Sequence, residues 1–132
     1  IAQQKIKELY ITADTIVILN NQILGKPKDE NDAYQMLKSL SGKTHLVHTG
    51  VAILYKQKIY SFFDETAVTF YTLSDIEINN YIKHCKPYDK AGSYGIQDWM
   101  GYVGIQKMEG DFFNVMGLPL HRLYRELNTL LN

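Results

Sequence analysis

Apolar, β-branched stretches alternate along the chain with short polar turns, a pattern typical of β-strands and hairpins. The run from Tyr10 to Leu19 predicts a buried strand, and Asn20-Asn21 predicts a tight turn into a partner strand at residues 22–24. Residues 44–55 and 59–71 are rich in Val, Ile, Thr, Phe and Tyr, so they predict two long strands joined by a polar turn.

Other segments carry apolar residues at helical spacing. Asp29 or Asp32 can cap the first of these helices, and Ser74 with Glu77 forms a capping box at the start of the second. Pro119 fits the first turn of the last helix. The apolar positions predicted to be buried in the first and last of these helices are Ala33, Met36, Leu37, Leu40, Leu120, Leu123, Tyr124, Leu127 and Leu130.

Strands and helices mixed in this order predict an α/β protein with a strongly bent mixed sheet, to which Tyr102–Met108 adds a late strand. Residues 1–132 are expected to form a single domain, because no repeat, low-complexity tract or linker interrupts them. The first residues predict a helix, with Ala2, Ile6 and Leu9 on one face, that has no N-cap. We therefore expect the domain to be truncated at its N-terminus.

Charge and cysteine content narrow the classes of function. Lys and Arg number 14 and Asp and Glu number 14, so no global field attracts the protein to nucleic acid or to an acidic membrane. Cys85 is the single cysteine, and no apolar run reaches the length of a membrane span. The sequence therefore predicts a cytoplasmic protein with no nucleic-acid or membrane partner, whose anion sites, if any, are local.

Asp14 is unusual because it lies inside an apolar strand-like run. Aspartate is disfavoured in strands, and a buried carboxylate without a partner is costly. A metal ion, a lysine or backbone donors could compensate, and an Asp at the strand mouth that accepts bonds from a turn is an equal alternative. His45 and His48 offer no metal site, since their spacing places them on opposite faces of a strand.

Several lysines lie beside Gly, Pro or Asp, where a phosphate chain could meet positive charge and bare backbone N–H groups. These are Lys5, Lys26, Lys28 and Lys90. Taken singly, each is better explained as a solvated loop lysine. The segment 89–97 holds two glycines and ends at Gln97, whose amide could read a base or a ribose, but it is neither a Walker A loop nor a dinucleotide fingerprint.

Taken in order, the motifs resemble those of one family. They are Ala13-Asp14-Thr15, Gly25-Lys26-Pro27-Lys28, the segment from Leu40 to His45, Thr49-Gly50-Val51, Asp89-Lys90-Ala91-Gly92-Ser93-Tyr94-Gly95-Ile96-Gln97 and the segment from Glu109 to Leu120. This series is similar to the successive motifs of Maf proteins and extends over essentially the whole chain. The resemblance implies the elongated fold shared with the inosine-triphosphate pyrophosphatases, with a nucleotide cleft between two lobes.

The same resemblance implies an activity: hydrolysis of a nucleoside triphosphate between its α and β phosphates, with Mg²⁺ or Mn²⁺ as the divalent metal. Asp14 matches the acidic residue that binds metal or activates water. The residues that it implies for substrate binding are Lys5, Thr15, Lys26, Lys90 and Gln97. The Tyr94-Gly95-Ile96-Gln97 version resembles the subgroup that acts on dTTP and UTP, and modified nucleotides are left open.

Two departures from the family pattern and one alternative remain. Asp98-Trp99 stands where many members have a further glycine, and the Ser-Pro-Arg-Arg-type segment with which Maf proteins begin is not in this sequence. Maf proteins are also associated with septum inhibition, so a nucleotide-binding regulator of cell division is the alternative function. Retention of Asp14 favours the enzyme, and the sequence leaves open whether the protein forms a homodimer.

Overall fold

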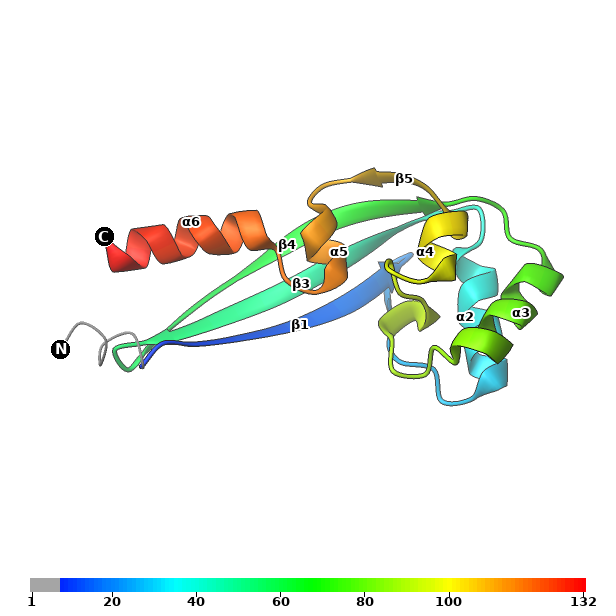
Figure 1. Ribbon diagram of the computed structural model, residues 1–132, viewed down its shortest axis with the longest axis horizontal. Coiled ribbons are helices and arrows are strands. Elements are labelled where there is room, and N and C mark those ends of the chain that lie inside the picture. The colour runs from blue at the N-terminus through cyan, green and yellow to red at the C-terminus, as the bar shows by residue number, and fades with distance from the viewer. Residues whose placement is uncertain (1–7) are drawn as a thin grey trace.

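A computed structural model describes residues 8–132, which form an elongated α/β body. Figure 1 shows a long sheet with helices gathered at one end and a single helix along the other. The elements in chain order are β1 (Tyr10–Leu19), β2 (Gln22–Leu24), α2 (Glu30–Leu40), β3 (Thr44–Tyr55), β4 (Lys58–Phe70), α3 (Asp75–Cys85), η1 (Ala91–Ser93), α4 (Trp99–Gly104), β5 (Ile105–Glu109), α5 (Phe112–Met116) and α6 (Leu120–Leu131).

The five strands form one sheet in the order β2-β1-β3-β4-β5, and every pairing among them is antiparallel. Two tight hairpins build it, with φ of 50° and 63° at Asn20 and Asn21 and of 51° and 63° at Lys56 and Gln57. Such left-handed pairs match the twist of the strands that they join. The predicted α/β class and the predicted turns are confirmed. The prediction of a mixed sheet was wrong, since hairpins and antiparallel neighbours account for every strand pairing in the described residues.

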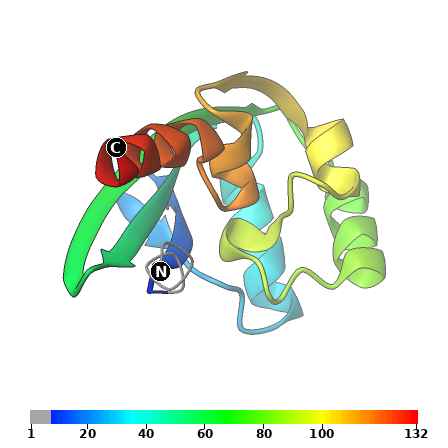
Figure 2. The same ribbon diagram turned by 60° about the vertical axis from the view of Figure 1, so that its left-hand side comes forward.

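Helices cover the sheet at its two ends (Figures 1 and 2). At one end α2, α3 and α4 close the larger core, in which Leu37, Phe70 and Met100 are no more than 1% exposed. Toward the other end α6 lies along the sheet, and Leu123 packs with Val51 in a smaller core. The described residues include no helix of the length and apolarity that a membrane crossing requires.

Local capping decides where the helices begin. Asp29, not Asp32, is the N-cap of α2, because its side chain accepts the Asp32 N–H at 2.8 Å. Ser74 and Glu77 form the predicted capping box of α3, with bonds of 3.1 Å and 2.8 Å. These caps use contacts within four residues, which is why the sequence reveals them.

Two predictions of burial were wrong, one on β1 and one on α6. β1 is buried only toward its end, where β2 pairs with Val17–Leu19, and its first half contacts β3 but is exposed. On α6, Leu120 is 45% and Tyr124 is 66% exposed, because only the Leu123 side of that helix meets the sheet. The helix predicted over the first residues falls outside the described part of the chain, apart from Glu8 and Leu9, which are not helical.

The late strand was also predicted too long. Residues 99–104 form α4, so β5 is confined to Ile105–Glu109. Asp98 starts the helix by accepting the N–H groups of Met100 and Gly101. α5 was not predicted at all; Asp111 caps it by accepting the Phe113 N–H at 2.8 Å. Both helices are short, so their apolar pattern is too brief to distinguish helix from strand.

Candidate functional site

A cleft of about 530 Å³ opens beside β1, between the helical end of the molecule and α5. Its walls are β1 with Val47 of β3, the loop at Lys26, the segment 89–98 and residues 115–117. Its polar lining consists of Asp14, Thr15, Lys26, Asp89, Lys90, Gln97 and Asp98. The fold thus brings together five of the six residues predicted for the site, and Lys5, the sixth, lies outside the described residues.

Asp14 is exposed, contrary to the expectation of a buried carboxylate. Its Oδ1 accepts the N–H of Thr15 at 3.0 Å. Its partner residue on β3 is Gly50, and a Cβ added at Gly50 would meet no atom within 4 Å. Asp14 therefore also borders a second, shallower hollow of about 320 Å³ that includes Gly50. An exposed carboxylate needs no buried counter-ion.

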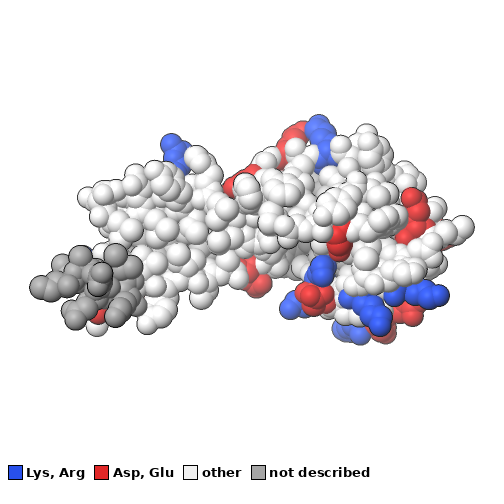
Figure 3. Space-filling model, in the orientation of Figure 1, with Lys and Arg blue, Asp and Glu red and all other residues white. Residues whose placement is uncertain are grey.

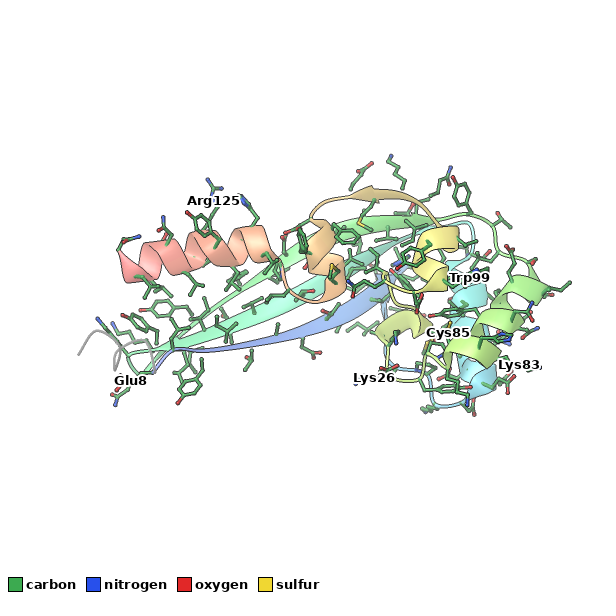
Figure 4. The ribbon with its side chains drawn as sticks, viewed as in Figure 1. Glu8, Lys26, Lys83, Cys85, Trp99 and Arg125 are labelled. Atoms are coloured by element: carbon green, nitrogen blue, oxygen red, sulfur yellow. The ribbon has the colours of Figure 1, made fainter. Side chains whose placement is uncertain are left out.

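Lys26 and Lys90 come from loops that are joined to each other. The Gly92 N–H donates to the Gly25 carbonyl at 3.1 Å, so the turn that follows Lys90 is fixed to the loop that holds Lys26. The hydrogen bond from Lys90 lowers the pKa of Asp89, and the charge of Lys26 lowers it further. Both ammonium groups therefore act on one region at the mouth of the cleft, where Lys26 is exposed (Figure 4).

Asp98 holds the segment that presents Gln97. Its carboxylate accepts four hydrogen bonds: from the Tyr81 hydroxyl at 2.7 Å and from the N–H groups of Gly95, Met100 and Gly101 at 3.2, 3.0 and 3.4 Å. Burial, then the bond to Asp98, raises the pKa of Tyr81, so this hydroxyl stays a donor. The sequence showed Asp98 only as a departure from the family; an Asp just before a helix was the signal of an N-cap.

The backbone of this segment is held from the other side as well. The Tyr102 hydroxyl donates to the Gln97 carbonyl at 2.9 Å. A Cβ at Gly101 would overlap the Ile96 carbonyl oxygen, so α4 packs against the segment through a glycine. The exposed Gln97 side chain therefore projects from a fixed backbone into the cleft.

Glycine 92 allows the Lys90 turn to approach β1. Its φ is +72°, and a Cβ there would lie 3.0 Å from Cγ2 of Val17. We expect Gly92→Ala to destabilise the fold by about 1–2 kcal/mol, from left-handed strain and contact with Val17. Urea unfolding measures this effect. Gly25→Ala is the control, since its Cβ would meet nothing within 4 Å. If both variants lost the same free energy of unfolding, the strain and the Val17 contact at Gly92 would not be the cause.

The cleft offers a divalent metal one carboxylate ligand, that of Asp14, and no complete set of protein ligands among the described residues. The described residues contain no group of three or more His, Cys, Asp or Glu side chains that could hold a metal ion. Asp98 is committed to four donors, whereas Asp14 keeps an oxygen that accepts no hydrogen bond from the described residues. Mg²⁺ often binds through one or two carboxylates together with substrate phosphates and water, which is the set that Asp14 and a nucleotide could supply.

The fold and cleft define an α/β protein with three carboxylates, of Asp14, Asp89 and Asp98, and two lysines around a nucleotide-sized hollow. The family described as Maf-like protein matches residues 1–130. The chain belongs to the Maf family, as its motifs indicated.

Curated relatives agree with this assignment. A dTTP/UTP pyrophosphatase of Porphyromonas gingivalis is 56% identical over 119 residues, which cover 90% of this chain and 60% of the relative. A dTTP/UTP pyrophosphatase of Phocaeicola vulgatus is 57% identical, covering 93% of this chain and 64% of that protein. One of Bacillus cereus is 48% identical, covering 96% and 66%. The chain thus spans less than two thirds of the length of these relatives.

Proposed function

We propose that the protein hydrolyses dTTP and UTP to the monophosphate and pyrophosphate. The observation that carries this proposal is the cleft itself, where Asp14, Lys26, Lys90 and Gln97 converge from three separate segments. The relatives named dTTP/UTP pyrophosphatase support the substrate class. Because these relatives are longer than this chain, the proposal concerns the activity of the full-length gene product.

The two lysines are proposed to bind the phosphates. A triphosphate carries several negative charges, and attack of water at phosphorus requires that they be partly neutralised. The protein has no net charge, so local cations must do this. Figure 3 shows basic and acidic side chains gathered over the helical end, while the sheet end is largely uncharged on this face. Lys26 and Lys90 lie where the helical end meets the cleft.

Asp14 is proposed to activate the attacking water or to hold the metal. Its exposed carboxylate lies at the edge of the cleft and is fixed by the Thr15 N–H. A bound Mg²⁺ or Mn²⁺ would supply positive charge and Lewis acidity at the phosphates. Water attacks the α phosphorus in this scheme, the bond to the α–β bridging oxygen breaks, and pyrophosphate leaves with that oxygen.

Gln97 is proposed to select the base. Its amide carries both a donor and an acceptor, which suits the edge of a pyrimidine. Asp98 and Tyr102 fix the backbone on which Gln97 stands, so its reach into the cleft is restricted.

A nucleotide-binding regulator of septum formation is the second candidate. Such a binder needs the lysines and Gln97 but not a carboxylate, so the presence of Asp14 in the cleft favours the enzyme. A cytoplasmic location suits free nucleotides as substrates and stays a prediction, as does a homodimer.

The test is a screen for pyrophosphate release over canonical and modified nucleotides with Mg²⁺ or Mn²⁺. We expect dTTP or UTP to give a higher kcat/KM than ATP or GTP. Gln97→Ala should lower the ratio of pyrimidine to purine kcat/KM by about tenfold, which corresponds to the loss of roughly one well-formed hydrogen bond. Gln106→Ala is the control, since Gln106 is exposed on β5 and does not line the cleft. A purine triphosphate as the best substrate would contradict the proposed specificity.

A further inference from the structure

A chain of buried polar side chains joins the cleft to α5. Thr49, Thr66 and Asn114 are each 0% exposed although their neighbours on this face of the sheet, Val47 and Val51, are apolar. A buried polar group is costly unless it is hydrogen-bonded, so three of them together indicate a definite arrangement. None of the three was singled out from the sequence as a functional residue.

The direction of every bond in this chain follows from its acceptors. Thr49 donates its one hydroxyl proton to the Asn114 carbonyl at 2.8 Å, because a carbonyl can only accept. Thr66 likewise donates to the Asp111 carbonyl at 3.0 Å. The Asn114 side-chain amide therefore donates to the Thr66 hydroxyl at 3.0 Å, and it also donates to the Val47 carbonyl at 3.1 Å.

Because each threonine hydroxyl has one proton, the direction of the Thr15 hydrogen bond is also determined. The hydroxyls of Thr15 and Thr49 lie 2.9 Å apart, and the proton of Thr49 is already committed to Asn114. Thr15 must then donate to Thr49. Its hydroxyl has no second proton, so Thr15 meets the cleft only with lone pairs, that is, as a hydrogen-bond acceptor.

The chain also fixes the wall opposite Thr15. Asn114 is the third residue of α5, and the residues that follow it, Val115 to Gly117, line the cleft. Gly117 has a φ of +117°, and a Cβ there would lie 3.8 Å from the Thr15 hydroxyl. α5 therefore ends directly against Thr15, and Figure 2 shows it lying over the strands between α6 and the helical end.

We propose that Thr49 and Asn114 are positioning residues of the nucleotide site, which hold the end of α5 against β1 and make Thr15 an obligate acceptor toward the ligand. This inference rests on the proposed function. Asp14 is not part of this series of hydrogen bonds, since its carboxylate accepts the Thr15 N–H and does not contact the Thr15 hydroxyl. The pair should therefore govern binding of the nucleotide and leave the chemical step intact.

The kinetic experiment compares Thr49→Val with Thr49→Ser in the full-length protein. Valine removes the hydroxyl, so Thr15 is free to rotate its proton into the cleft, and α5 keeps only one of its two side-chain bonds to β3, the bond from the Asn114 amide to the Val47 carbonyl. We expect KM for dTTP or UTP to rise about tenfold with kcat within twofold, and we expect serine to restore KM. A fall in kcat at constant KM, or no change in either constant, would overturn the proposal.

A matched control lies on the same strand. Thr44 pairs with Thr69 of β4 through hydroxyls 2.7 Å apart, in an exposed position outside the cleft. Thr44→Val removes the same kind of cross-strand bond, so it reports the structural cost alone. We expect it to leave KM unchanged, and an equal rise in KM would overturn the positioning role.

A second measurement does not depend on turnover. Hydrogen–deuterium exchange of residues 111–118 should become at least about tenfold faster in Thr49→Val and in Asn114→Ala, and not in Thr44→Val. Unchanged exchange in the first two variants would overturn the proposal even if kinetics changed. If the wild-type protein released no pyrophosphate from any nucleotide, the proposed function would fail, and exchange would still decide whether Thr49 and Asn114 hold α5.

Discussion

Asp14→Asn in the full-length protein is expected to lower pyrophosphate release from dTTP or UTP by about 100-fold or more. The substitution keeps the shape of the side chain and an oxygen for the Thr15 N–H, which lies 3.0 Å from Oδ1. It removes the negative charge, and with it the capacity to accept a proton from water or to bind a divalent cation. Because Asp14 is exposed, the free energy of unfolding should change by less than about 0.5 kcal/mol.

The chain offers a close control for this variant. Asp64 of β4 accepts the N–H of the next residue, Glu65, at 2.9 Å, as Asp14 accepts that of Thr15, but it does not line the cleft. Asp64→Asn should retain turnover within a few-fold. Turnover of Asp14→Asn at a similar level would remove Asp14 from the reaction and require another group to activate the water or hold the metal.

Features that depend on near neighbours were predictable from the sequence. β1 was predicted with the bounds that it has, and the hairpin turn at Asn20-Asn21 and the capping box at Ser74 were also correct. Each is decided by residues a few positions apart, so periodicity and capping preferences suffice.

Features that depend on tertiary contacts were not predictable in the same way. α4 exists because Asp98 caps it and because Gly101 fits against the Ile96 carbonyl, a contact that strand propensity at Tyr102 and Val103 conceals. Thr49 is another example. Thr49 belongs to a family-like motif, but its high β propensity predicts only a strand, and the approach of Asn114 from 65 residues away is what makes it part of a buried hydrogen-bond network.

The candidate site could be proposed from the sequence because its residues occur in an ordered series of motifs. Lys26 and Lys90 had no individual signal, and a solvated loop lysine was the better explanation of each. The structure places both on one cleft with Asp14 and Gln97, and the turn at Gly92 connects their loops. What the sequence misjudged at Asp14 was exposure: the strand-like run predicts burial, but the sheet covers β1 only toward its end.

Acid is expected to destabilise the protein through His45. This side chain is 1% exposed, its Nε2 lies 2.6 Å from the Tyr94 hydroxyl, and its Nδ1 has no hydrogen-bond partner among the described residues. The ring also meets Phe70 edge-on at 5.3 Å between centroids. Burial in these surroundings lowers the pKa of His45 to about 4. No described carboxylate bonds to this histidine, so nothing offsets the cost of its charge.

The sign of the effect follows from proton binding. The folded-state pKa lies below the unfolded value of about 6.5, so the unfolded state binds the proton first as pH falls. Stability is therefore complete above pH 6.5 and is lost as pH falls toward 4. At about 1.4 kcal/mol per pKa unit, the loss between pH 7 and pH 4.5 is about 2 kcal/mol from this residue alone.

The measurement is urea unfolding of the full-length protein at pH 7 and pH 4.5, compared between variants. His45→Gln stays neutral and can still bond the Tyr94 hydroxyl, so it should lose about 2 kcal/mol less than wild type over this interval, whatever its stability at pH 7. His121→Gln is the control, because His121 is exposed on α6 and should leave the pH dependence unchanged. Acidic carboxylates titrate equally in all three proteins and cancel in the comparison. If His45→Gln and wild type lost the same free energy, the buried imidazole would be excluded as the source of acid sensitivity.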